Sequence, residues 1–441
     1  MLKDSSELEI TTDSHLTVAA INEFTDELLS VGNKTQVIKQ AVEADSNCVI
    51  ANALVAAFHL FSGQSNALAA AAPYINNASL NLRHANKREK LYVAAIQAWA
   101  KRDIKNAIVY HEIIAKHYPR DLASVHIAQY HYRNTGDSQG LLRIAEKVAE
   151  ANLDNSYIYG MLAFGLEECH RLEEAEIAGR KAVEMKHNNR WAQHAVAHVL
   201  ETQGRLDEGI AWMESVWDTW ESSNEAFYNH LWWHTALYHL DADDIHKVLE
   251  IYDTQIWGRA RKDNGREQIN AISLLLRLQL RGLDVNAWWR EIADYLYPRL
   301  HEHLIPFLDL QYIYALVRGG RNDWAVEMLD SIKNYADKAQ PYAQKTWRNI
   351  ALPAAYGMIA HAQGNWLDSI NQLEPVLPKL YSTGGSHAQR DLFEQIYLDA
   401  LIHANENEKA RVLLSKRNTA RSNIPITQRQ LANVHSKLNG G

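Results

Sequence analysis

The chain repeats one helix–turn–helix pattern along its length. A small residue in one helix is followed by a short polar turn, then by an aliphatic or aromatic residue and a second small residue three positions later. The pattern recurs in AAIQAWAKRDIKNA, AFGLEECHRLEEA, AHVLETQGRLDEG, ALYHLDADDIHKV, YGMIAHAQGNWLDS and LDALIHANENEKA, with turns near Arg102, His170, Gly204, Asp243, Gly364 and Asn405. Nearly every segment has a period of 3.6 residues, which predicts an all-α chain of helix hairpins. Small residues beside the turns allow the paired helices to approach closely.

The spacing of the turns indicates the type of hairpin. The turns at His170, Gly204 and Asp243 are 34 and 39 residues apart (170 to 204, 204 to 243), in the range of tetratricopeptide-type repeats. Each hairpin exposes an apolar face that its neighbour covers, so we expect one continuous α-solenoid. We divide it into an N-terminal array over 1–255, an irregular helical joint over 256–322 with insertions, and C-terminal hairpins over 323–441.

Composition excludes several classes of function. The net charge of -8 and the pI near 6.2 provide no basic stripe, so we expect no nucleic-acid partner. Neither an apolar leader segment nor an apolar run of membrane-spanning length occurs, so we expect no membrane partner. Cys48 and Cys169 are too few for a disulfide framework and wrongly spaced for a zinc knuckle. We predict a cytoplasmic protein.

Two histidine pairs are the most informative candidates for a functional site. His194 and His198 lie in WAQHAVAHVLE, and His230 and His234 follow 36 residues later in NHLWWHTALYHL. The i, i+4 spacing puts each pair on one face of a helix. The predicted stripes along the first helices of successive hairpins are Trp191, His194, His198 and Glu201, then His230, His234, Leu237 and Asp241. Helices that pack 8 to 10 Å apart would let the two stripes face one atom or one small ligand.

Three interpretations of these histidines stay open. In the first, the histidines are hydrogen-bonded packing residues. In the second, the histidines form a polar pocket with apolar walls from tryptophans 191, 232 and 233. In the third, the histidines bind a metal ion. Neutral imidazoles suit zinc or another transition metal, and Glu201 or Asp241 would then ligate the ion or orient an imidazole. The pattern is not HExxH, because no glutamate follows His194.

A second candidate segment is GGSHAQRD at 384–391. Ser386 and Gln389 have the spacing of a capping box, which accounts for both residues structurally. The two glycines before the helix and the positive charge of Arg390 would also suit an anionic group. The segment resembles a G-x-S-x-G elbow, but no strand precedes it, so we reject a nucleophilic serine here.

Several long motifs resemble one family. WAQHAVAHVLETQGRLDEGIAW, HLWWHTALYHLD, GGSHAQRDLF, ELEITTDS, REKLYVAAIQAWAKRDIKNAI and YPRDL are similar to the marker segments of the tetratricopeptide repeat protein 38 family, also called StaR-like. The resemblance covers nearly the whole chain and implies an α-helical repeat fold, without a generally established activity. In that family the segment matching FLDLQYIYAL usually carries a histidine where this chain has Gln311.

The sequence therefore predicts a concave pocket, lined by histidine and tryptophan, that binds a small polar or anionic molecule or a peptide segment. Its predicted ligand-binding residues are Trp191, His194, His198, His230, His234, His387, Gln389 and Arg390. The alternative is an enzyme, metal-dependent or histidine-based, in the same pocket, with His194, His198, Glu201, His230 and His234 as catalytic candidates. The four histidines 194, 198, 230 and 234 are the candidate ligands of a transition metal such as zinc. A scaffold for protein partners is the third possibility.

Overall fold

A computed structural model describes residues 1–62, 64, 66–422 and 424–439. These residues form 24 α-helices with short 3₁₀ and π segments between some of them, which confirms the predicted all-α helix-hairpin class. The strands among them are two residues long and were not predicted: β1 (Leu2–Lys3) pairs antiparallel with β2 (Glu9–Ile10). No helix in the described ranges combines the length and the apolar character needed to cross a membrane.

The chain divides into two compact units. Unit 1 comprises Met1–Arg133, Asp137–Val196 and Val216–Tyr228, and unit 2 comprises Asn134–Gly136, Ala197–Ser215 and Asn229–Gly441, of which 423 and 440–441 lie outside the described residues. The predicted division at 255 and 322 follows the sequence pattern and stays a prediction. The boundary between the units passes through helices.

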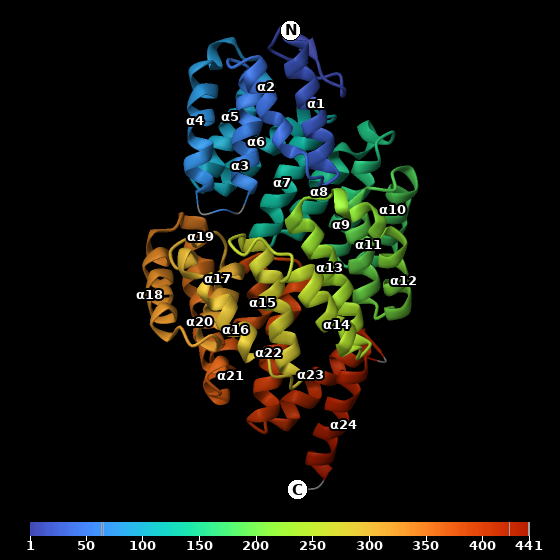
Figure 1. Cartoon of the computed structure of the whole chain (residues 1–441), viewed down its shortest axis with the longest axis vertical. Coiled ribbons are helices and arrows are strands. Elements are labelled where there is room, and N and C mark those ends of the chain that lie inside the picture. Colours follow the sequence, from blue (N-terminus) through green and yellow to red (C-terminus); the bar gives the residue numbers. More distant parts are fainter. Residues whose placement is uncertain (63, 65, 423, 440–441) are drawn as a thin grey trace. The chain divides into compact units, whose positions relative to one another are not determined.

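The helices of unit 1 are short and follow one another closely (Figure 1). They are α1 (His15–Leu29), η1 (Thr35–Val37), α2 (Ile38–Ala44), α3 (Val49–Phe61), α4 (Ala67–Leu80), η2 (Leu82–His84), α5 (Lys87–Ala100), α6 (Ile104–His117), α7 (Leu122–Thr135), α8 (Ser138–Ala149), η3 (Glu150–Asn152), α9 (Ser156–Glu168), α10 (Leu172–Met185) and η4 (Trp217–Ser222). α7 ends within the short unit 2 segment at 134–136. Three further helices cross the boundary: α11 (Arg190–Thr202), α12 (Leu206–Val216) and α13 (Glu225–Asp241).

The remaining helices belong to unit 2. They are α14 (Ile245–Ile251), η5 (Tyr252–Ile256), α15 (Gly265–Leu280), α16 (Asn286–Asp294), η6 (Tyr297–Arg299), α17 (Pro306–Arg318), α18 (Asn322–Lys338), α19 (Pro341–Thr346), η7 (Trp347–Ala351), α20 (Leu352–Ala362), α21 (Trp366–Leu373), η8 (Leu377–Thr383), α22 (His387–His403), α23 (Asn407–Ala420) and α24 (Pro425–Asn439). In both units, consecutive helices such as α9 and α10 or α20 and α21 pack as hairpins.

The predicted turns share one backbone conformation. Arg102, His170, Gly204, Asp243, Gly364 and Asn405 all have a positive φ, between 58° and 79°. At Gly204 the backbone N–H donates to the carbonyl of Glu201 (3.0 Å), and the next N–H, of Arg205, donates to the carbonyl of Leu200 (3.0 Å). These two bonds satisfy carbonyls that a helix end leaves unpaired and reverse the chain. The turn positions read from the sequence are therefore confirmed.

Small residues bring neighbouring helices together, and the prediction for paired helices is confirmed at Gly357 of α20, where an added Cβ would lie 2.6 Å from Leu373 Cγ of α21. A Cβ atom added to Gly165 of α9 would lie 2.8 Å from the Cα of Leu142 in α8, and one added to Gly179 of α10 would lie 2.6 Å from Val196 Cγ2. Non-bonded carbon atoms do not approach so closely. The short distance between these helices is therefore possible only because glycine has no side chain.

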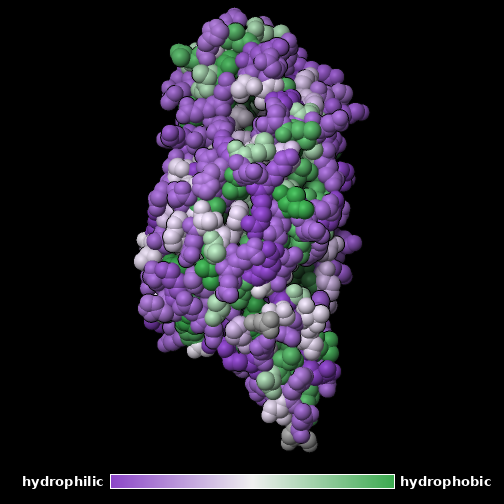
Figure 2. All heavy atoms as spheres, turned by 90° about the vertical axis from the view of Figure 1, so that its right-hand side faces the viewer, coloured by the Kyte–Doolittle hydropathy of each residue, from purple (hydrophilic) through white to green (hydrophobic). Residues whose placement is uncertain are grey.

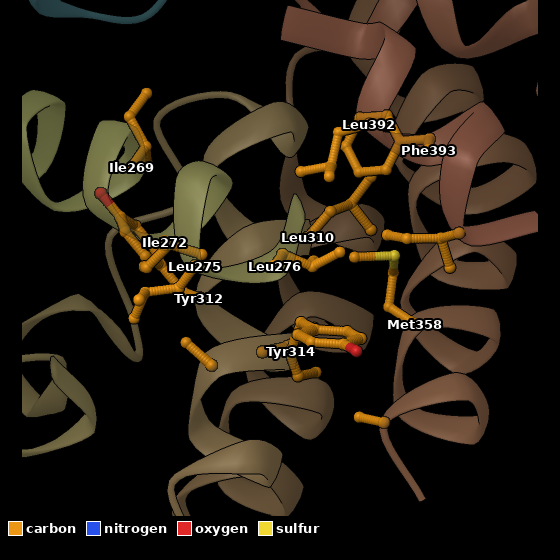
Figure 3. Packing of buried hydrophobic residues seen from close by; sticks show 14 of the residues in the cluster. Ile269, Ile272, Leu275, Leu276, Leu310, Tyr312, Tyr314, Met358, Leu392 and Phe393 are labelled. Atoms are coloured by element: carbon orange, nitrogen blue, oxygen red, sulfur yellow. The ribbon is translucent and has the colours of Figure 1, made fainter. Parts of the chain in front are cut away.

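The core of unit 2 lies between α15, α17, α20 and α22. Figure 3 shows Ile269, Ile272, Leu275 and Leu276 of α15 with Leu310, Tyr312 and Tyr314 of α17, Met358 of α20, and Leu392 and Phe393 of α22. Unit 1 has its own apolar clusters, one around Phe24, Ile50 and Tyr92 and one around Ile158 and Phe164. On the face seen in Figure 2, hydrophilic residues predominate and hydrophobic ones are interspersed, as is usual for a water-exposed surface.

Candidate functional site

Unit 2 brings three of the predicted histidines together. His198 lies on the last turns of α11, and His230 and His234 lie on α13. The ring centroids of His198 and His234 are 4.6 Å apart, and those of His230 and His234 are 4.7 Å apart. Each of the three offers one ring nitrogen, and these nitrogens lie within 4.8 Å of one another. We call these three residues the histidine cluster.

Glu201 orients His234. The Nδ1–H of His234 donates to Glu201 Oε2 over 3.2 Å, and the exposed fraction of Glu201 is 7%. A carboxylate oxygen only accepts, so the proton of a neutral His234 lies on Nδ1 and the lone pair lies on Nε2. The structure therefore places Glu201, a predicted partner of the histidines, one hydrogen bond away from the cluster.

A chain of amides orients His230. Asn229 Nδ2 donates to the carbonyl of Ile256 (2.8 Å), and Asn270 Nδ2 donates to Asn229 Oδ1 (2.9 Å). Because the carbonyl only accepts, both amide orientations are determined, and Asn270 Oδ1 is left to accept the Nδ1–H of His230 (3.1 Å). His230 and His234 thus share one tautomer, with the lone pair on Nε2. Such hydrogen bonds on the outer ring nitrogen fix the orientation of metal-binding histidines.

The cluster is largely removed from water. His198 and His234 are fully buried, and His230 is half-buried. Burial lowers the pKa of His234 well below its ordinary value, and the charges of His198, His387 and Arg277 lower it further. His234 is therefore neutral at pH 7, which is the form that coordinates metal ions.

Sequence reasoning missed Arg277. This residue of α15 is 2% exposed, and the part of the chain described here provides it with no carboxylate within salt-bridge distance. Its guanidinium donates to Ser273 Oγ and to the carbonyls of Ser273 (3.3 Å) and Ala388 (3.1 Å), and it lies 5.4 Å from the centre of the Trp233 ring. The available signal was an arginine inside the apolar run SLLLRLQL of a helix whose residues are nearly all buried.

His387 lies beside the histidine cluster, whereas Gln389 and Arg390 have local partners. The ring of His387 lies 5.6 Å from that of His198, and its Nε2 shares a hydrogen bond of 2.7 Å with Thr202 Oγ1. Gln389 completes the predicted capping box with Ser386: each backbone N–H is bonded to the other side chain (3.0 and 3.3 Å). The guanidinium of Arg390 donates to the carbonyl of Gly385. Anion binding at this helix start stays a prediction.

Trp191 and His194 belong to unit 1. The two rings stack with centroids 5.2 Å apart, and Phe164 and Phe227 pack against both. His194 is 2% exposed, and within unit 1 its ring contacts the rings of Trp191, Phe164 and Phe227. In unit 2 the predicted wall residue Trp233 is buried and stacks on His230 (5.3 Å).

Two further residues from the sequence argument have structural roles. Asp241, a predicted metal ligand or partner of an imidazole, instead accepts hydrogen bonds from Arg281 (2.9 Å) and Arg421. Gln311 is fully buried in α17, where its amide donates to the carbonyl of Phe307 (3.4 Å).

Comparisons with known proteins yield weak similarities. No family model matches the chain. Among solved structures, yeast Tom70 is similar with a TM-score of 0.36 and 12% identity, over 96% of this chain and 88% of that one. The Naa15/Naa10 complex bound to HypK-THB is similar with a TM-score of 0.26 and 10% identity, over 96% of this chain and 66% of that one. At these scores neither structure indicates what this chain binds.

Proposed function

We propose that unit 2 is a binding module whose histidine cluster holds a transition metal ion such as zinc. The observation that carries this proposal is the proximity of the three ring nitrogens of His198, His230 and His234. The hydrogen bonds from His234 to Glu201 and from His230 to Asn270 support it, because metal-binding imidazoles need such partners on the other nitrogen.

The three imidazoles of unit 2 would supply three of the four ligands that a tetrahedral zinc ion takes, and a fourth ligand from water or a small molecule would complete the set. This arrangement is typical of zinc sites that bind or activate a ligand, whereas purely structural sites usually have four protein ligands. Neutral nitrogen donors also suit copper, cobalt and nickel ions, so the residues define the class of metal ion rather than the element. In a metal-dependent reaction at this site, Glu201 would act indirectly, because its carboxylate holds the imidazole of His234 in place.

A second candidate function is the binding of a small anion without a metal ion. The observation in its favour is Arg277, a buried guanidinium whose hydrogen bonds go to a hydroxyl and to carbonyl groups rather than to a carboxylate. A buried charge without a counter-ion is costly, and an anion at this position would reduce the cost.

The metal content of untagged protein, purified without an affinity metal, tests the first proposal. We expect about one metal ion per chain, and loss of that ion in His230→Gln and His234→Gln. His111→Gln is the matched control, because His111 is an equally buried histidine in unit 1. With zinc at about 100 times its Kd, the stability of the wild-type protein should rise by about 2.7 kcal/mol.

The opposite results separate the two candidate functions. Metal-free protein that neither binds added zinc nor gains thermal stability would refute the metal proposal. If the same protein then binds sulfate, and Arg277→Gln abolishes that binding, the anion proposal replaces it.

We also propose membership in the tetratricopeptide repeat protein 38 family. The support is the set of motifs quoted above, within which His198, Glu201, His230, His234 and His387 all lie. The helix hairpins are consistent with the repeat fold that this resemblance implies.

A further inference from the structure

Unit 2 contains a pocket that is separate from the histidine cluster. Its volume is about 170 Å³, and it lies where the ends of α13 and α15 meet α22, α23 and α24. Neither the histidines of the cluster nor Glu201, Asn270 or Arg277 line it. It therefore has its own chemistry.

At one end of the pocket, two arginines share one carboxylate. Asp241 accepts a hydrogen bond from Arg281 Nη2 (2.9 Å) and another from the guanidinium of Arg421. Two guanidinium groups thus share one carboxylate, which leaves one positive charge uncompensated within this group of three. The side chain of Arg281 is 9% exposed and that of Arg421 is 20% exposed, so solvent screens this charge little.

The same two arginines have donor atoms without an acceptor. Arg281 Nη1 and Arg421 Nε are both buried, and neither has a hydrogen-bond partner among the residues that the structure describes. Buried donors normally have partners, because leaving one unsatisfied costs about 1 to 3 kcal/mol. Asp241 fixes both guanidinium groups in the lining of the pocket, and the two unpaired N–H groups lie just beneath its surface.

The acidic residues of the pocket already have cationic or hydrogen-bonding partners. Asp391 and Glu394 both accept from Arg417 (2.6 and 2.7 Å), and Asp399 pairs with His361 (3.0 Å). Two carboxylates on one guanidinium leave one negative charge at this end of the pocket, which would repel a doubly charged anion such as phosphate. A singly charged carboxylate fits the pair of arginines better.

The rest of the lining sets the size and polarity of the ligand. Leu280, Leu398, Ile424 and Ile426 contribute apolar surface. A cavity of about 150 Å³ in another protein accommodates benzene, so about 170 Å³ provides room for one ring and a small polar group.

We propose that this pocket binds a small monocarboxylate with an apolar body about the size of one aromatic ring. The carboxylate accepts from Arg281 and Arg421, and the apolar body contacts the leucines and isoleucines. The site stands independently of the metal proposal, since the two share no residue.

Calorimetric titration of the full chain with benzoate tests this inference. We expect benzoate to bind, and benzamide, benzylamine and inorganic phosphate to bind at least tenfold more weakly. Arg281→Met should weaken benzoate binding by about 10- to 100-fold, since a hydrogen bond to a charged group is lost. Arg429→Met is the control, because Arg429 pairs with Asp243 (2.8 and 2.9 Å) outside the pocket lining.

A second variant keeps the test independent of the arginines. Ile426→Trp fills the apolar part while leaving both guanidinium groups in place, and it should also abolish benzoate binding. The proposal is overturned if benzoate does not bind, if benzamide, benzylamine or phosphate binds as well as benzoate, or if benzoate binds equally to wild type and to both pocket variants.

Discussion

Replacing Glu201 by glutamine changes the partner of His234 without removing its hydrogen-bond acceptor. The carboxylate accepts the Nδ1–H of His234 over 3.2 Å in a nearly closed environment, where Glu201 is 7% exposed. The amide oxygen of glutamine can occupy the same position, but it is neutral. The variant therefore isolates the effect of the negative charge on the imidazole.

The size of the effect follows from the two kinds of hydrogen bond. A bond to a charged group contributes about 1.5 to 3 kcal/mol, and a neutral one about 0.5 to 1.5 kcal/mol, so the difference is about 1 to 1.5 kcal/mol. A metal ion on Nε2 makes the Nδ1–H more acidic and increases its need for a charged acceptor. We expect Glu201→Gln to weaken zinc binding by about tenfold, the lower end of the range for partners of this kind.

Competition with a chromophoric zinc chelator at pH 7.5 measures this change. Glu208→Gln is the control, because Glu208 is half-exposed and pairs with Arg205 (2.6 Å) one turn beyond the hairpin bend. Circular dichroism of the metal-free variants verifies that both fold. Equal zinc affinities in a folded Glu201→Gln variant and in wild type would refute the assigned role of Glu201.

Two further predictions concern unit 1. Burial lowers the pKa of His111 from 6.5 to about 3 and that of His131 well below 6.5, so below pH 6.5 the unfolded chain takes up protons that the folded unit cannot. The free energy of unfolding should therefore fall as pH decreases from about 6.5 toward 3, by about 1.4 kcal/mol per pH unit for each histidine. Urea unfolding between pH 7.5 and 4.5 measures this dependence. If the free energy of unfolding of His111→Gln depended on pH as steeply as that of wild type, the assignment would be contradicted. In α9, Gly165→Ala should destabilise unit 1 by about 1 to 3 kcal/mol because its Cβ would lie 2.8 Å from Leu142 Cα. In Gly160→Ala the nearest contact of the Cβ is 3.2 Å, so the higher helix propensity of alanine should offset most of the strain. Equal melting temperatures for the two variants would contradict the close-packing argument.

The hairpins could be predicted because their signal is local. A turn residue in the left-handed conformation and small residues beside it are both visible within about a dozen consecutive positions. Arg102 and His170 show how far this reaches, since the pattern located them as turns although neither is a glycine, and both have a φ of 58°. The short β1–β2 pairing escaped prediction because two residues per strand are too few to show an alternating pattern.

The site could be predicted only in part because its remaining members come from distant helices. The spacing of His230 and His234 on one helix face is readable, and so is the proximity of Glu201 to the turn. Asn270 and Arg277 come from α15, and nothing in the sequence around the histidines indicates which face of α15 meets them. For the same reason the sequence around Asp241 does not show that its carboxylate accepts hydrogen bonds from Arg281 and Arg421, which lie far along the chain.

X-ray absorption at the zinc edge of the zinc-loaded full chain tests the central claim most directly. The histidine cluster predicts three imidazole nitrogens at about 2.0 to 2.1 Å and one further nitrogen or oxygen ligand, with one imidazole lost in His230→Gln. A spectrum dominated by sulfur, or one of oxygen ligands alone that is the same in the variant, would contradict it.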